Sequence, residues 1–203
     1  MVQAPMTLPV VTALRARGPG RVAVDLDGRP WRILPLEAVV KGRLAVGVGL
    51  DRTSARALRR ELRRLEARDV ALRALRARDH TTASLEQRLA DRGTAAAVRR
   101  ETVAAAQRAG LVDDQRFAGG RAALLASRGA GDLLIADDLE RHGVPAEAAR
   151  AAIDELEPES TRAARIIAVR GASPQTARRL AAKGFSEAAL ESLVADLVTE
   201  ELG

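Results

Sequence analysis

The feature that most constrains the fold is a short pattern that occurs three times and ends each time in glycine. Each copy has Leu, two further residues, a cationic or imidazole side chain and then Gly, so the copies end at Gly93, Gly143 and Gly184. A positive group in the last turn of a helix faces the exposed carbonyls, and a glycine after it takes the left-handed conformation that closes the helix. The pattern predicts three helices with the same end, and it explains His142 as a C-terminal helix residue rather than a ligand.

Further helices are predicted on both sides of each of these three. The helices before them are expected at 70–78, 115–127 and 160–170, and those after them at 95–109, 145–156 and 187–198. The units are thus three-helix repeats, and each buries its apolar face mainly against its neighbours. We predict a mainly α-helical, elongated array with a long continuous surface and no single deep pocket.

The first 50 residues read as strands instead of helices. Apolar residues alternate with others over 10–16, 22–26 and 44–50, and Asp27-Gly28 between two alternating runs is a strong hairpin signal. We predict a small antiparallel module of about four strands, with Trp31 in its core.

A strongly basic helix is predicted over residues 52–78. Its leucines keep to one stripe at helical spacing, while arginines occupy the other faces. A solvated helix face and an anion-contacting face explain these arginines equally well. The candidates for anion contact are Arg59, Arg60, Arg63 and Arg64.

Charge is unevenly distributed along the chain. The first 110 residues carry a net charge of +11 and the remaining 93 a net charge of -5, which together give the total of +6. This asymmetry indicates an anionic partner for the front half, either nucleic acid or an acidic protein surface.

The absence of Cys excludes disulfides and thiolate metal sites, and no signal peptide or membrane span is apparent. We expect a cytoplasmic protein without cofactor or metal.

The run from Gly110 to Ala118, GLVDDQRFA, lies between the first and second repeats. Asp113 and Asp114 are suited to a helix start, where a carboxylate accepts backbone N–H groups and meets the positive end of the dipole. Phe117 follows one turn later as a candidate core anchor, and its replacement by Ala is expected to cost about 3 to 5 kcal/mol. No nucleophile, ligand cluster or phosphate loop accompanies the two carboxylates, so no catalytic residue is assigned.

This run resembles the segment that joins the first two repeats in the RecX family, the bacterial regulators of the RecA recombinase. The resemblance extends over about residues 70–200, and the leading strands resemble the β extension that some members carry. Its structural motif comprises Gly93, Asp113, Asp114, Arg116, Phe117, Gly143 and Gly184. The chain is accordingly divided into a β module (1–50), a basic linker helix with the first repeat (51–110), a second repeat (111–157) and a third repeat (158–203).

The resemblance implies a protein that lies in the groove of the RecA filament on single-stranded DNA. We expect it to be a monomer. Such a protein inhibits or modulates the ATPase, strand-exchange and SOS coprotease activities of RecA. Direct DNA contact, if any, is expected to be weak. The contact candidates beyond the basic helix are Arg116, Arg121, Arg128, Arg162, Arg165, Arg178 and Arg179.

Three other functions remain open. A general nucleic-acid-binding protein would use the Arg-rich N-terminal half, although the chain has few aromatics for base stacking. A scaffold that bridges other proteins is a second alternative. An enzyme is the weakest, because no motif with a mechanism occurs in the chain.

Overall fold

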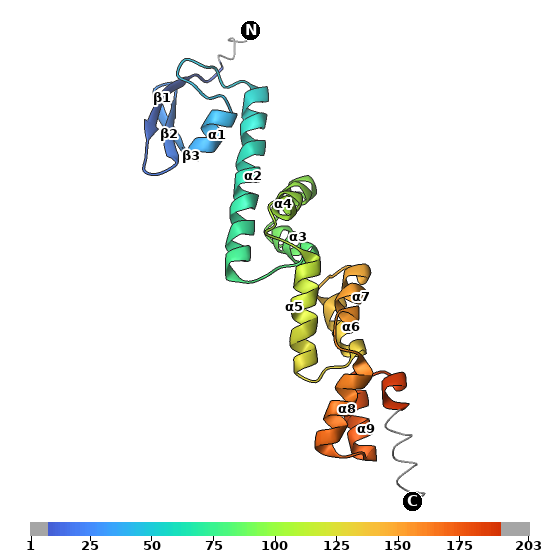
Figure 1. Ribbon diagram of the computed structural model, residues 1–203. Coiled ribbons are helices and arrows are strands. Elements are labelled where there is room, and N and C mark those ends of the chain that lie inside the picture. Colours follow the sequence, from blue (N-terminus) through green and yellow to red (C-terminus); the bar gives the residue numbers. More distant parts are fainter. Residues whose placement is uncertain (1–7, 192–203) are drawn as a thin grey trace, which may run out of the picture.

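The computed structural model describes residues 8–191 and begins with an antiparallel sheet of three strands (Figure 1). The strands β1 (Val11–Ala16), β2 (Arg21–Leu26) and β3 (Arg29–Pro35) lie in that order and are followed by the short helix α1 (Leu36–Lys41). Asp27 and Gly28 form the predicted β2–β3 turn, and both have positive φ, 51° and 76°. Such a turn suits the twist of a hairpin because both central residues are left-handed.

Two sequence predictions for this module are wrong. Residues 44–50 form no strand, because Gly47 has a φ of 87° that interrupts an extended chain, and only an isolated bridge joins Val10 to Gly49. The segment still covers the outer edge of β1, since the Val11 amide donates to the Val48 carbonyl at 2.9 Å. Trp31 is not in the core: its side chain stands on an exposed stretch of β3, and the residue is 37% exposed.

A single helix, α2 (Arg52–Ala77), connects the β module to the first repeat. Asp51 caps its start by accepting the Ser54 amide at 2.6 Å. Leu58 near its beginning packs into the core of the β module, whereas Ala67 and Ala71 pack into the core of the first repeat. The stretch 70–78 is therefore the end of the basic helix rather than a separate helix, because no glycine or proline interrupts the apolar stripe.

The remaining helices form the three repeats. The first repeat adds α3 (Thr82–Ala90) and α4 (Ala96–Arg108) to the end of α2. The second comprises α5 (Asp114–Ser127), α6 (Asp132–Arg141) and α7 (Ala146–Asp154), and the third contains α8 (Glu159–Arg170) and α9 (Pro174–Ala182). Residues 187–191 begin the helix predicted at 187–198, and its remainder lies outside the described residues.

The repeated glycine-ended pattern forms the same structure each time. Gly93, Gly143 and Gly184 have φ values of 72°, 72° and 79°, which is the left-handed conformation that the pattern predicts. In each copy the residue after the glycine donates its amide to the carbonyl of the pattern's leucine, at 3.0 to 3.1 Å. These leucines, at 89, 139 and 180, are at most 1% exposed. The glycine turn thus closes each middle helix while its leucine anchors the repeat.

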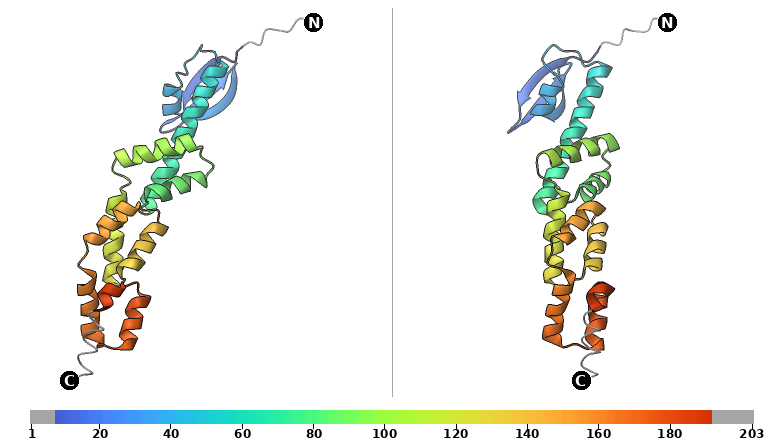
Figure 2. Two further views of the ribbon diagram at one scale, coloured as in Figure 1. Left: turned by 90° about the vertical axis from the view of Figure 1, so that its right-hand side faces the viewer. Right: turned by 45° about the vertical axis from the view of Figure 1, so that its right-hand side comes forward.

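Residues 8–191 share no single central core. In the described part of the chain the buried apolar residues form four separate clusters, one for the β module with α1 and the start of α2, and one for each repeat. Figures 1 and 2 show these units following one another from the N-terminal to the C-terminal end. The fold is mainly helical and elongated, as predicted. None of the helices within 8–191 has the length and apolar run that crossing a bilayer requires.

Candidate functional site: the repeat junctions and the arginine surface

At the first junction, the end of α6 in the second repeat meets the start of α3 in the first. The Thr81 hydroxyl donates to the carbonyl of His142 at 2.7 Å. The Gly143 turn lies so close to α3 that a Cβ atom on it would be 2.6 Å from the Cβ of Ala83. The Thr82 amide, at the start of α3, donates to the Asp114 carboxylate at 2.7 Å. One carboxylate of the GLVDDQRFA motif therefore ties the two repeats together.

The second junction repeats this arrangement between α9 and α6. The Gly131 amide donates to the Lys183 carbonyl at 2.8 Å, and the Leu133 amide donates to the Gly184 carbonyl at 3.0 Å. The Asp132 amide donates to the Glu159 carboxylate at 2.6 Å, so Glu159 does here what Asp114 does at the first junction. Because the N-cap of α6 is a glycine with no side-chain cap, the next repeat supplies the acceptors that its first amides need.

The three middle helices consequently lie end against end, in the reverse of their order in the sequence. The C-terminal turn of α9 rests on the start of α6, and the C-terminal turn of α6 rests on the start of α3. These three helices follow one another along one side of the molecule (Figure 2). The junctions fix the direction in which the repeats succeed one another, and so determine the surface that the array offers.

Three other residues of the GLVDDQRFA run, Asp113, Arg116 and Phe117, make contacts around the start of α5. Asp113 caps α5 by accepting the Arg116 amide at 2.9 Å, as its position predicts. Both terminal nitrogens of the Arg116 guanidinium donate to the Gly110 carbonyl at 3.3 Å. Phe117 is half-buried against the core of the repeat, with its ring centroid 5.8 Å from that of His142. The motif therefore builds the helix start and the junction beside it.

Arg162 is held inside the second junction. It is only 7% exposed, and its guanidinium donates to the carbonyls of Ala130 at 2.8 Å and Glu157 at 3.0 Å. Its remaining nitrogen donates to the Asp132 carboxylate. Burial and the nearby Glu159 carboxylate raise the pKa of Asp132 above its ordinary value, although Arg162 acts in the opposite direction. The structure thus places Arg162 where it joins repeats, away from any external ligand.

Three further candidates are engaged with carboxylates. Arg121 donates twice to Asp138, at 2.7 and 2.9 Å, and this pairing lowers the pKa of Asp138. Arg165 donates to Glu157 at 2.6 Å, and Arg64 joins α2 to α4 by donating to Glu101 at 3.0 Å. These arginines stabilise contacts within the chain. Because each is paired with a carboxylate, it presents less positive charge to a partner than an unpaired arginine would.

The other candidates are exposed and free. Within residues 8–191 these side chains have no hydrogen bond or ion pair: Arg59, Arg60, Arg63, Arg128, Arg178 and Arg179. Arg59, Arg60 and Arg63, which we call the free arginines of α2, lie next to one another on that helix. Since no carboxylate within residues 8–191 pairs with them, they are able to bind an external anion.

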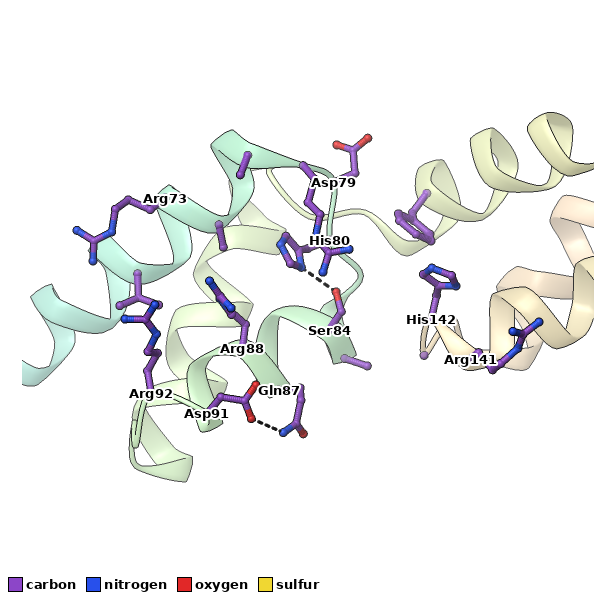
Figure 3. A pocket seen from close by; sticks show the side chains of 17 residues that line it. Arg73, Asp79, His80, Ser84, Gln87, Arg88, Asp91, Arg92, Arg141 and His142 are labelled. Atoms are coloured by element: carbon purple, nitrogen blue, oxygen red, sulfur yellow. Dashed lines mark hydrogen bonds between the residues drawn. The ribbon is translucent and has the colours of Figure 1, made fainter.

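A cationic cavity that sequence reasoning missed lies at the first junction. Its volume is about 900 Å³, and its lining includes five arginines against two aspartates. In Figure 3, Arg88 of α3 and Arg92, which lies in the turn after α3, extend toward α2, which contributes Arg73. Burial, together with the charges of Arg78 and Arg88, lowers the pKa of the His80 side chain.

These arginines come from separate helices, so charge counting along the chain could not bring them together. Only the spacing of Arg88 and Arg92, four residues apart across the end of α3, is a local signal for a shared face. In the described part of the chain no three His, Asp or Glu side chains are grouped as metal ligands. Because five arginines and only two aspartates line the cavity, it is suited to binding anions.

The fold and its junctions define an elongated protein of tandem three-helix repeats behind a small β module. No family model matches the sequence, and no curated protein matches it either. Among solved structures, the regulatory protein RecX is similar at a TM-score of 0.76 and 18% identity, over 93% of this chain and 100% of that one. RecX from Lactobacillus salivarius is similar at a TM-score of 0.58 and 16% identity, over 68% of this chain and 97% of that one. The chain has a RecX-like fold.

Proposed function

We propose that the chain is a non-enzymatic regulator that binds RecA and its filament on single-stranded DNA, and that it inhibits or modulates the activities of that filament. The observation that carries the proposal is the likeness to the regulatory protein RecX along nearly the whole chain, β module included. The GLVDDQRFA run, which carries the sequence resemblance, also supports it, because its Asp114 joins the first two repeats and its Asp113 caps α5.

The shape and charge of the molecule support this function. Four small cores in a row give an extended molecule that can contact several successive subunits of a polymer. Several weak contacts on one rigid chain reinforce one another, because each contact after the first is made at a high effective concentration. The free arginines of α2 and the cationic cavity supply positive charge along this length.

The test is the ATPase activity of RecA on single-stranded DNA, measured while the chain is titrated at several DNA concentrations. A filament-binding regulator changes the ATPase rate at a fixed ratio of chain to RecA, and excess DNA does not restore the rate. An unchanged rate at a molar excess of chain would refute the proposal.

The general nucleic-acid-binding alternative predicts a different result in the same experiment. A protein that only competes for DNA lowers the ATPase rate when DNA is scarce, and added DNA fully restores it. The free arginines of α2 are the observation in its favour, since no carboxylate in the described part of the chain pairs with them. The RecA ATPase rate at high DNA concentration therefore separates the two functions: it stays changed for a filament-binding regulator and is restored for a protein that only competes for DNA.

A further inference from the structure

The three-stranded sheet carries an exposed tryptophan, Trp31, on β3. Ile33 alternates along β3 with Leu34, which is buried in the core of the module, so Ile33 lies on the opposite face. Trp31 lies at an irregularity of β3, where the pairing with β2 passes from Arg32 to Pro30, and it is not packed against that core. Trp31 is 37% exposed and Ile33 is 51% exposed. Across the sheet, Ile33 pairs with Ala23 and Ala23 with Arg15, so a small residue separates the apolar pair from an arginine.

Arginines are spread along this sheet. The same alternation puts Arg15 and Arg21 on the outer face, while Arg17 follows the end of β1 and donates its amide to the Arg21 carbonyl at 2.9 Å. Because Arg21 pairs with Pro35, Arg17 and Arg21 lie at the end of the sheet away from Trp31. Arg15 donates to Asp25, the one carboxylate of β2, at 2.5 Å, whereas Arg17 and Arg21 are exposed with no carboxylate paired to them in the described residues. The end of the Arg32 side chain lies 5.8 Å from the centroid of the Trp31 ring, where cation–π attraction steadies the ring.

An exposed aromatic ring beside Arg32, with further arginines along the same sheet, has the chemistry of a platform for unpaired bases. Bases stack on the ring while the guanidinium groups meet the phosphates that alternate with them along a strand. A duplex could not use the ring, since its bases are already stacked on one another. An acidic peptide would satisfy the arginines and leave the ring and Ile33 without a matching surface.

We propose that the outer face of the β module, centred on Trp31, is a binding site for single-stranded DNA. The ring stacks on one base, and Arg17 and Arg21, roughly 13 Å further along the sheet at about 3.3 Å per residue, contact phosphates beyond the neighbouring nucleotides. This contact is made by the chain itself and needs no RecA, so it is separate from the function proposed above. It gives the β module a role that the repeats do not supply.

The chain contains the reporter for its own test, because Trp31 is its only tryptophan and it has no tyrosine. Tryptophan emission is measured for the full chain, without RecA, during titration with a thymidine oligonucleotide of about eight nucleotides. Stacking should quench the emission in a saturable way. An abasic oligomer of the same length and charge should bind more weakly and quench little.

Substitutions then divide the site into stacking and charge. Trp31→Ala should weaken binding of a labelled oligonucleotide by about 5-fold to 150-fold, while Trp31→Phe retains most of the affinity. Val169→Ala is the matched control, because Val169 is 83% exposed on α8, away from the sheet. Arg17→Gln and Arg21→Gln, read through Trp31 emission, should each reduce the salt slope of binding by about 0.7.

Circular dichroism and the unfolding midpoint verify that each variant is folded. Emission that does not change while the labelled oligonucleotide saturates the chain would place DNA elsewhere and overturn the proposal. Equal affinity of Trp31→Ala and the parent chain would overturn it as well. Stronger quenching by polyglutamate, or by RNA of the same length, would reassign the face to an acidic protein or to RNA and refute the DNA assignment.

Discussion

The glycine turns at the ends of the middle helices allow the repeat junction to be tested with a matched pair of substitutions. Gly93 and Gly143 have the same φ of 72°, and each closes a helix of the same pattern. A Cβ atom on Gly93 would meet nothing within 4 Å, whereas one on Gly143 would lie 2.6 Å from the Cβ of Ala83. Alanine at either position requires the same backbone conformation, but only at Gly143 does it collide with the neighbouring repeat.

The expected magnitudes follow from these two contributions. A left-handed alanine costs about 1 to 2 kcal/mol, so Gly93→Ala should lower the free energy of unfolding by that amount. Forcing a methyl group into a packed contact costs about 1 to 3 kcal/mol more, which gives about 2 to 5 kcal/mol for Gly143→Ala. Asparagine tolerates the left-handed conformation, so Gly93→Asn should be nearly neutral, while Gly143→Asn remains destabilising.

The assay is urea unfolding followed by far-ultraviolet circular dichroism. The difference between the two alanine variants isolates the junction, since the backbone contribution cancels. Loosening the junction should also broaden the transition of Gly143→Ala, because neighbouring repeats of an array lose cooperativity when their interface weakens. Equal destabilisation by Gly93→Ala and Gly143→Ala would show that the close approach to Ala83 contributes no stability, and the account of the junction would then be wrong.

Three further outcomes are expected. Arg68 and Lys41 lower the pKa of Glu37 from 4.5 to about 2, so its charge contributes stability above pH 4.5 that is lost as the pH falls toward 2; urea midpoints across this range should be flatter for Glu37→Gln than for the parent chain. Replacing the free arginines of α2 by Gln should weaken inhibition of the RecA ATPase without changing the unfolding midpoint, whereas Arg64→Gln, which breaks a link between α2 and α4, should lower that midpoint and leave inhibition nearly intact. Deleting residues 1–50 should leave the three repeats folded, because their cores are separate from that of the β module; loss of cooperative unfolding by circular dichroism would contradict this.

The helical part of the fold could be predicted because its signals are local. A leucine, a cation and a glycine at fixed spacing specify a helix end wherever they occur, and the three glycine turns adopt that conformation. Asp113 was equally readable, since a cap bonds to an amide only three residues away. The hairpin turn at Asp27-Gly28 belongs to the same category.

The errors concern surfaces that depend on distant parts of the chain. Alternation predicts a strand over 44–50, but a strand also needs a continuous partner, and Gly47 turns the chain away. Trp31 alternates as a core residue would, yet α1 and α2 cover only the face that carries Leu34. No sequence pattern states which face of a sheet a helix will cover.

The arginine surface was predictable only in part for a related reason. Charge counting does not separate an arginine that faces solvent from one whose partner lies a repeat away. Arg162 meets the Ala130 carbonyl 32 residues earlier, and Arg121 meets Asp138 on the next helix. The cationic cavity likewise joins side chains of α2, α3 and α6.

The end-to-end contact of α9, α6 and α3 gives the molecule an electrical polarity. Each junction sets the partly negative end of one helix against the partly positive end of the next, so the three peptide dipoles point the same way. The positive pole is the start of α9 at Ser173, and the negative pole is the Gly93 turn. The molecule can lie along a filament in two opposite directions, and reversing its long axis exchanges these poles. A filament that has its own polarity will therefore bind the two orientations with different free energies.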